Sequence, residues 1–98
     1  MTVNRVGLVY EALLQVTHAV LNDPKEARIT VRALDNLIAF RIWVAPRDRG
    51  NLIGKHGQTI HAIRAIASAM GKADNLRFTV EIEDISTSSL LRDGRFSG

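Results

Sequence analysis

The chain has 98 residues, a formal net charge of +3 and no cysteine. This length fits a single domain, and a chain without cysteine has no disulfide, thiolate zinc site or cysteine nucleophile, which suits a reducing cytoplasm. No apolar run approaches the ~20 residues that a membrane span needs, and residues 1–9 lack the pattern of a signal peptide, so we expect a soluble cytoplasmic protein without membrane contact.

Residues 3–21 predict a first helix. Asn4 is suited to cap its start, and Pro24 ends it because proline disfavours helical geometry in the residue before it. Apolar side chains recur every three or four positions and form one stripe, which consists of Val6, Val9, Tyr10, Leu13, Val16, Val20 and Leu21.

Two strands are predicted next, over residues 28–34 and 37–45. The turn signal Asp35-Asn36 separates them, so we expect an antiparallel hairpin. The second strand alternates clearly: one side carries Ile38, Phe40, Ile42 and Val44, and the other carries Ala39, Arg41 and Trp43.

Pro46 ends the second strand, and two helices are predicted over residues 47–53 and 58–70, the second of them ending at Gly71. Its apolar face consists of Ile60, Ile63, Ile66, Ala67 and Met70.

Residues 76–82 alternate as a third strand, which completes the order α-β-β-α-α-β. We therefore expect one α+β domain over residues 1–84, followed by a flexible polar tail over residues 85–98.

Most of the positive charge lies in one segment. Residues 41–77 contain seven basic and two acidic residues, for a net charge of +5, whereas the rest of the chain has a net charge of −2. Such a concentration is expected of a phosphate-binding face, although a solvated basic surface would show it as well.

The string Gly54-Lys55-His56-Gly57 between the two predicted helices is the candidate binding site. Glycines allow left-handed backbone angles and the close approach of another backbone. The helix that follows points its N–H groups and the positive end of its dipole at the turn, which favours a phosphate. Lys55 adds a charge and His56 adds donors. The same spacing also occurs in helix–helix turns that bind no ligand, so the string alone leaves both interpretations open.

The surrounding sequence resembles the core motif of KH domains, an Ile-Gly-x-x-Gly-x-x-Ile signature between two short helices. Here the motif reads Ile53-Gly54-Lys55-His56-Gly57-Gln58-Thr59-Ile60, followed by Ile63-Arg64. Over residues 3–83 the predicted order resembles the type II arrangement of bacterial KH domains. That arrangement implies a three-stranded mixed sheet with the helices on one face. The chain is most similar to single-domain bacterial KH proteins of the KhpA kind.

This resemblance implies a protein that binds single-stranded RNA, with a post-transcriptional or RNA-chaperone or assembly role. KH domains clamp about four nucleotides with the strand backbone against the Gly-x-x-Gly loop. Single-stranded DNA is an alternative ligand, because some KH domains bind both. Carried onto this chain, the RNA-binding residues are Arg47, Arg49, Asn51, Ile53, Gly54, Lys55, His56, Gly57 and Arg64.

A protein-interaction or dimerisation role is the alternative function. Related small KH proteins are associated with homodimers and with a larger multidomain KH-containing partner. By strand alternation Trp43 points away from the apolar side of the hairpin, and an outward tryptophan indicates a partner surface. We expect a dimer or partner contact at Trp43 in preference to RNA.

Other motifs do not fit. A nucleotide-binding P-loop needs four residues between its first glycine and the Gly-Lys pair, then Ser or Thr, but Gly50 and Gly54 enclose three residues, and His56 follows the lysine. His56 and His61 are five residues apart, which does not place them on one helix face as metal ligands. We find no nucleophile elbow and therefore expect neither an enzyme nor a cofactor.

Overall fold

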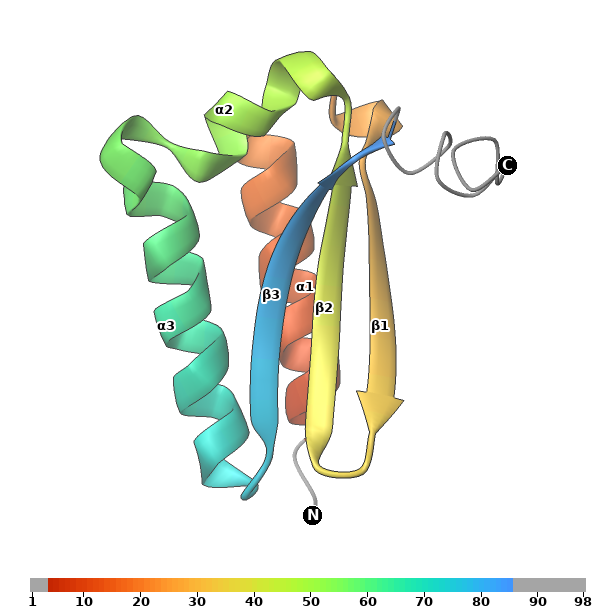
Figure 1. The fold of residues 1–98 in the computed structure, drawn as a ribbon, viewed down its shortest axis with the longest axis vertical. Helices are drawn as coiled ribbons and strands as arrows, with labels where there is room; N and C mark the ends of the chain where they lie inside the picture. Colours follow the sequence, from red (N-terminus) through yellow and green to blue (C-terminus); the bar gives the residue numbers. More distant parts are fainter. Residues whose placement is uncertain (1–3, 86–98) are drawn as a thin grey trace, which may run out of the picture.

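The computed structural model describes residues 4–85, so the predicted tail lies, apart from Ile85, outside the described residues. The predicted order of elements is confirmed (Figure 1). Short 3₁₀ turns precede β1 and α2 and form the connection between α2 and α3. The helices and strands are α1 (Arg5–Val20), β1 (Arg28–Leu34), β2 (Leu37–Val44), α2 (Arg49–Ile53), α3 (Gln58–Ala73) and β3 (Arg77–Asp84).

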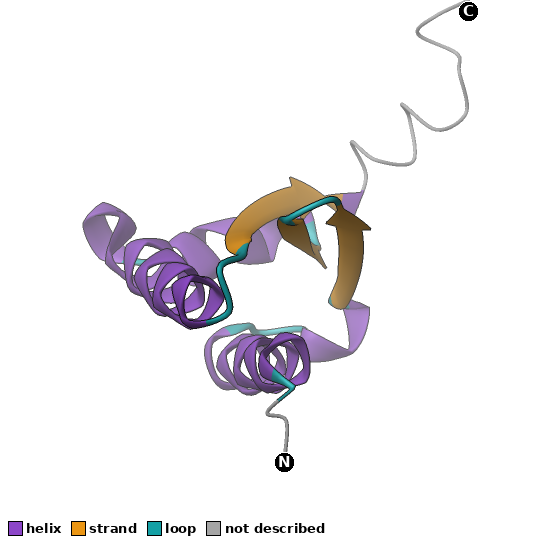
Figure 2. Cartoon of the chain, turned by 90° about the horizontal axis from the view of Figure 1, so that it is seen from below, coloured by secondary structure: helices purple, strands orange, loops and turns teal. Residues whose placement is uncertain are grey.

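The sheet is mixed, as the resemblance implied. Its strand order is β1-β2-β3, with β1 antiparallel and β3 parallel to β2. Asp35 closes the hairpin with a positive φ of 50°, a backbone region that aspartate tolerates better than most residues. Figure 2 shows the two long helices on the same side of the sheet, so in the described chain the opposite face has no helix over it.

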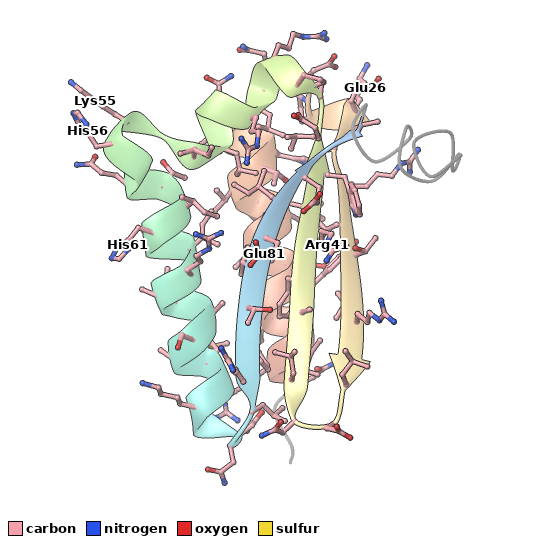
Figure 3. The ribbon with its side chains drawn as sticks, in the orientation of Figure 1. Glu26, Arg41, Lys55, His56, His61 and Glu81 are labelled. Carbon is pink, nitrogen blue, oxygen red and sulfur yellow. The ribbon has the colours of Figure 1, made fainter. Side chains whose placement is uncertain are left out.

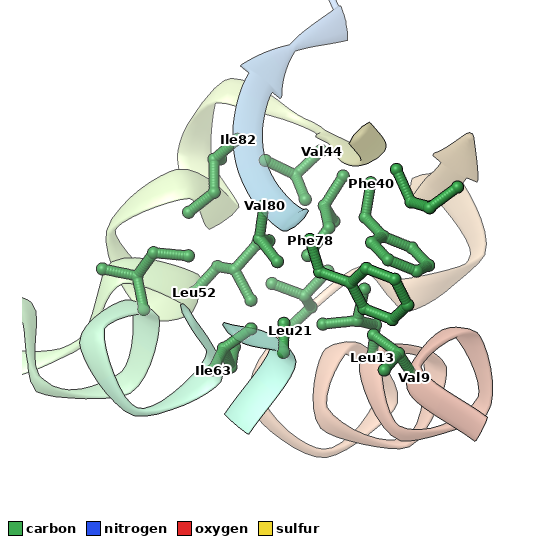
Figure 4. Close-up of a cluster of buried hydrophobic side chains, with 14 residues drawn as sticks. Val9, Leu13, Leu21, Phe40, Val44, Leu52, Ile63, Phe78, Val80 and Ile82 are labelled. Carbon is green, nitrogen blue, oxygen red and sulfur yellow. The ribbon is translucent and has the colours of Figure 1, made fainter. Parts of the chain in front are cut away.

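The hydrophobic core lies between the sheet and the long helices (Figure 4). Strand alternation predicts its sheet side correctly, because every second residue from Ile38 to Val44 in β2 and from Phe78 to Ile82 in β3 is buried. Phe40 and Phe78 meet edge to face with ring centroids 5.4 Å apart, a geometry that adds to the stabilisation from burial alone. Asn4 caps α1 as expected: its Oδ1 accepts the N–H of Gly7 at 3.0 Å.

The end of α3 differs from the prediction. The helix continues through Gly71 to Ala73, and Asn75 is the residue that takes a positive φ, of 56°. A Cβ at Gly71 would lie 2.7 Å from the carbonyl oxygen of Leu76 and 2.9 Å from the ring of Phe78. Gly71 therefore permits close packing of the following chain against α3 and does not end the helix.

Ile66 is the exception on the apolar face of α3. It is 60% exposed, because the buried positions of α3 are Ile60, Ile63, Ala67 and Gly71, and Ile66 lies beside that row. Ile66 and the half-exposed Leu8 border an apolar groove between α1 and α3. None of the helices among residues 4–85 has the length and apolar character required to span a membrane.

Candidate nucleic-acid interface

A four-residue loop, 54–57, connects α2 to α3. The N–H of Gly54 donates to the carbonyl oxygen of Gly50 at 2.9 Å, and the N–H of Gly57 donates to the carbonyl oxygen of Gly54 at 3.0 Å. The φ angles of Gly54, His56 and Gly57 are 81°, 56° and 73°. Two consecutive left-handed residues thus stand immediately before α3.

The two glycines of the loop differ in what surrounds them. A Cβ at Gly54 would lie 2.4 Å from Oγ1 and 2.9 Å from the backbone N of Thr59, so no side chain fits there. A Cβ at Gly57 would meet no heavy atom of the described chain within 4 Å. Gly54 is therefore required by the packing of the turn, whereas Gly57 leaves open space beside the start of α3.

The first turn of α3 borders that open space, and the N–H of Gln58, its first residue, donates to the carbonyl oxygen of Lys55. Gly57 is the N-cap residue and has no side chain with which to accept a hydrogen bond. The first N–H groups of a helix have no partner within the helix, and its dipole places a partial positive charge at the same end. An anionic group beside Gly57 would accept hydrogen bonds from such N–H groups and would be attracted by the partial positive charge.

Lys55 and His56 lie at the outer tip of the loop and point into solvent (Figure 3). Within residues 4–85 neither side chain takes part in an ion pair or hydrogen bond, so both are available to a ligand. His61, which the motif did not single out, lies one turn further along α3 and also points outward in Figure 3. Its only sequence signal is its place four residues after Gly57.

The surroundings of the loop are positively charged. Residues 49–73 contain four basic residues and no acidic residue. Arg49 opens α2, is exposed and forms no ion pair in the described chain. Ile53 precedes the loop, is half-buried and packs against the core.

Three of the residues predicted to bind RNA have partners inside the protein. Arg47 forms an ion pair with Asp23, although 69% of its side chain is exposed. The side-chain amide of Asn51 donates to Oδ1 of Asp48 at 3.1 Å. Arg64, on α3, donates from Nε to the carbonyl oxygen of Val80 at 2.9 Å. These contacts fix their places around the loop but leave fewer of their donors for a ligand.

Asp48 is a fully buried carboxylate that the sequence did not identify as special. Its two oxygens accept the N–H groups of Asn22 and Asp23, each at 2.9 Å. Burial alone raises the pKa of Asp48, but the hydrogen bonds from Asn22, Asn51 and Asp23, with the charge of Arg47, outweigh it and leave the pKa below its ordinary value. Asp48 thus ties the start of α2 to the end of α1.

The known proteins to which this chain is similar are KH-domain proteins. The family model described as "KhpA/KhpB, KH domain" matches residues 10–82. The RNA-binding protein KhpA of Treponema pallidum is 32% identical over 79 residues, which covers 81% of this chain and 99% of that protein. RNA-binding protein KhpA of Chlamydia trachomatis is 32% identical over 74% of this chain and 92% of its own length. The protein of that name in Listeria monocytogenes is 28% identical, with 74% and 95% covered. No solved structure matches the chain at a significant level.

Proposed function

Because this chain belongs to the KhpA/KhpB family of KH domains, we propose that it binds single-stranded RNA with the 54–57 loop, in a post-transcriptional or assembly role. The relatives are named as RNA-binding proteins. The observation that carries the proposal is the unobstructed start of α3 beside Gly57, with Lys55 and His56 exposed next to it.

In this proposal the sugar–phosphate backbone of the RNA lies against Gly57. One phosphate accepts N–H groups from the first turn of α3, and Lys55 and His56 contact phosphates on either side. Ile53 offers an aliphatic surface to a base, and Arg64 contacts the strand further along α3. Unstacked bases are needed for such contacts, so we expect single strands to bind more tightly than a duplex.

Replacing Lys55 and His56 together with Asp tests this site. The change reverses the charge at the loop tip, and we expect it to abolish binding of a short single-stranded RNA in a filter assay. The matched control replaces His18 and Lys25, which are exposed elsewhere, with the same two aspartates. Circular dichroism shows whether each variant is folded. Undiminished affinity in the folded loop variant would contradict the proposal.

The groove between α1 and α3 favours a second property, self-association. Its lining side chains are all apolar, so the groove offers no positive charge or side-chain hydrogen-bond donor to a phosphate. Leu8 and Ile66 protrude beside the groove with 51% and 60% of their surfaces exposed. In a two-fold dimer the same patch meets itself, and Ile66 of one copy would fill the groove of the other. A larger KH-containing protein with a similar face is the alternative partner.

Sedimentation measurements test this property. Ile66→Lys is expected to convert a dimer into a monomer without unfolding it, because the side chain is already exposed. Leu34→Lys is the matched control, since Leu34 is a 50% exposed leucine on the sheet. A wild-type protein that stays monomeric at high concentration would contradict the assignment.

A further inference from the structure

The open face of the sheet, opposite α1 and α3, is basic and carries the chain's single tryptophan. The strand register places on this one face the side chains that alternate with the buried ones. They include four arginines and two glutamates, so the face has an excess of positive charge. The charged residues of this face are Arg28, Arg32, Arg41, Arg77, Glu81 and Glu83.

Trp43 is held in place on this face. Its Nε1 donates to Oγ1 of Thr30 on the neighbouring strand at 3.1 Å. The guanidinium carbon of Arg41 lies 5.6 Å from the centroid of the indole ring. The register places Arg28 directly beside Trp43 on β1. The result is a half-buried indole, fixed at its polar edge, with Arg41 over its ring and with Arg28 on β1 and Glu83 on β3 as its register neighbours.

The open face is continuous with the surface beside α3. Arg64 reaches from α3 to the edge of β3, where its Nη2 lies 3.8 Å from Oε2 of Glu81. Glu81 is in turn the register neighbour of Arg41 on β2, and both are labelled on the sheet in Figure 3. Because Glu81 stands between two arginines, this row across the sheet keeps a net positive charge.

We propose that the open face, where the sequence favoured a protein contact at Trp43, is instead a second contact site for single-stranded nucleic acid. The inference rests on the proposed function of the 54–57 loop. A strand that leaves the loop passes Arg64 and stacks a base on Trp43, while Arg28 and Arg41 contact the adjacent phosphates. An aromatic surface combined with arginines is the chemistry that holds single strands without sequence preference. An acidic peptide would pair with the arginines but would not need the indole.

Trp43 reports on its own occupancy, because the chain has no other tryptophan. We compare oligouridines of four and twelve nucleotides; the shorter one has the length that a KH loop and groove hold. The twelve-nucleotide RNA is expected to quench the emission of Trp43 and to protect it from acrylamide. The four-nucleotide RNA is expected to bind without either effect. An indole that acrylamide does not reach in the free protein, or emission unchanged at saturating twelve-nucleotide RNA, would overturn the inference.

Two variants measure the contribution to affinity. Trp43→Ala is expected to weaken binding of the twelve-nucleotide RNA about tenfold and to leave binding of the shorter RNA unchanged. Arg41→Gln keeps the indole and is expected to reduce the salt dependence for the longer RNA by about 0.7 in log–log slope. Lys25→Gln, an exposed cation outside this face, is the control.

The loop variant separates this inference from the function on which it rests. If wild-type protein binds neither RNA, the proposed function fails. If it binds both, and the Lys55 and His56 double variant binds neither, the function stands. Equal affinity of wild type, Trp43→Ala and Arg41→Gln for the longer RNA would then overturn the second site alone.

Discussion

Residues 46–51, at the start of α2, and the 54–57 loop lie close together in the sequence and both carry basic side chains, but the structure uses them differently. In the 46–51 segment the side chains of Arg47 and Asp48 contact Asp23 and Asn22, and Asn51 donates to Asp48. In the loop, Lys55 and His56 have no such partner within residues 4–85. The first segment therefore holds α2 in place, and the loop is free to meet a ligand.

The largest expected difference in the free energy of unfolding is between alanine variants of the two loop glycines, Gly54 and Gly57. Gly54→Ala must adopt a φ of 81° and approach Thr59 too closely, so we expect a loss of about 3 kcal/mol in the free energy of unfolding. Gly57→Ala has free space around it, so only the left-handed angle costs about 1 kcal/mol. Urea denaturation measures both.

Gly57→Ala is expected to affect RNA binding more than it affects stability. The added methyl group of Gly57→Ala occupies the space proposed for the strand backbone, and we expect the folded protein to bind RNA more weakly than wild type. If Gly57→Ala bound RNA as well as wild type, the open space beside α3 would not be the ligand site.

Replacing Asp48 is expected to change the stability of the protein in a pH-dependent way without changing its affinity for RNA. Its pKa in the folded protein lies below the ordinary value of 3.8. The stabilisation from this carboxylate is therefore fully present above that value and is lost as the pH falls through the folded-state pKa. Asp48→Asn is expected to lower Tm at neutral pH, because an amide cannot accept both N–H groups equally. The difference from wild type should shrink in acid.

The same variant is expected to bind RNA with nearly wild-type affinity at temperatures where it is folded, since Asp48 does not face the ligand. Thermal melts from pH 7 to pH 3 provide the stability measurement, and filter binding at low temperature provides the affinity. A strong loss of affinity without loss of Tm would place Asp48 in the binding surface and remove the contrast.

Arg47 gives the smallest expected effect. Its ion pair with Asp23 is largely solvated, with 69% of the arginine side chain exposed, and exposed pairs contribute at most about 1 kcal/mol. Arg47→Gln should therefore change the free energy of unfolding only slightly. Chemical denaturation beside Lys25→Gln as a surface control checks this expectation.

The elements of the fold are predictable from the sequence because each buries one face. The alternation of Ile38, Phe40 and Ile42 and the spacing of Val9 and Leu13 identify their strand and helix directly. The prediction that Ile66 lies on the apolar, core-facing side of α3 is wrong, because Ile66 lies at the border of the buried row, where a shift of one residue decides whether a side chain is exposed.

Contacts between distant segments were not predictable. Asp48 is buried only because the chain at Asn22, 26 residues away, returns to it, and no local pattern reports that meeting. The sequence predicts a helix end at Gly71, which is wrong, because the glycine is required by the close approach of Leu76 and Phe78 and this tertiary contact leaves no local signal. For the same reason the residues of the predicted site divide only in the structure into those with internal partners and those without.

The salt dependence of RNA affinity tests the central claim most directly. We expect Lys55→Gln to reduce the log–log slope of affinity against salt by about 0.7, the value for one phosphate contact on a single strand. Arg47→Gln, which removes the same charge from the 46–51 segment, should leave the slope at its wild-type value. A reduced slope for Arg47→Gln with an unchanged slope for Lys55→Gln would contradict the account.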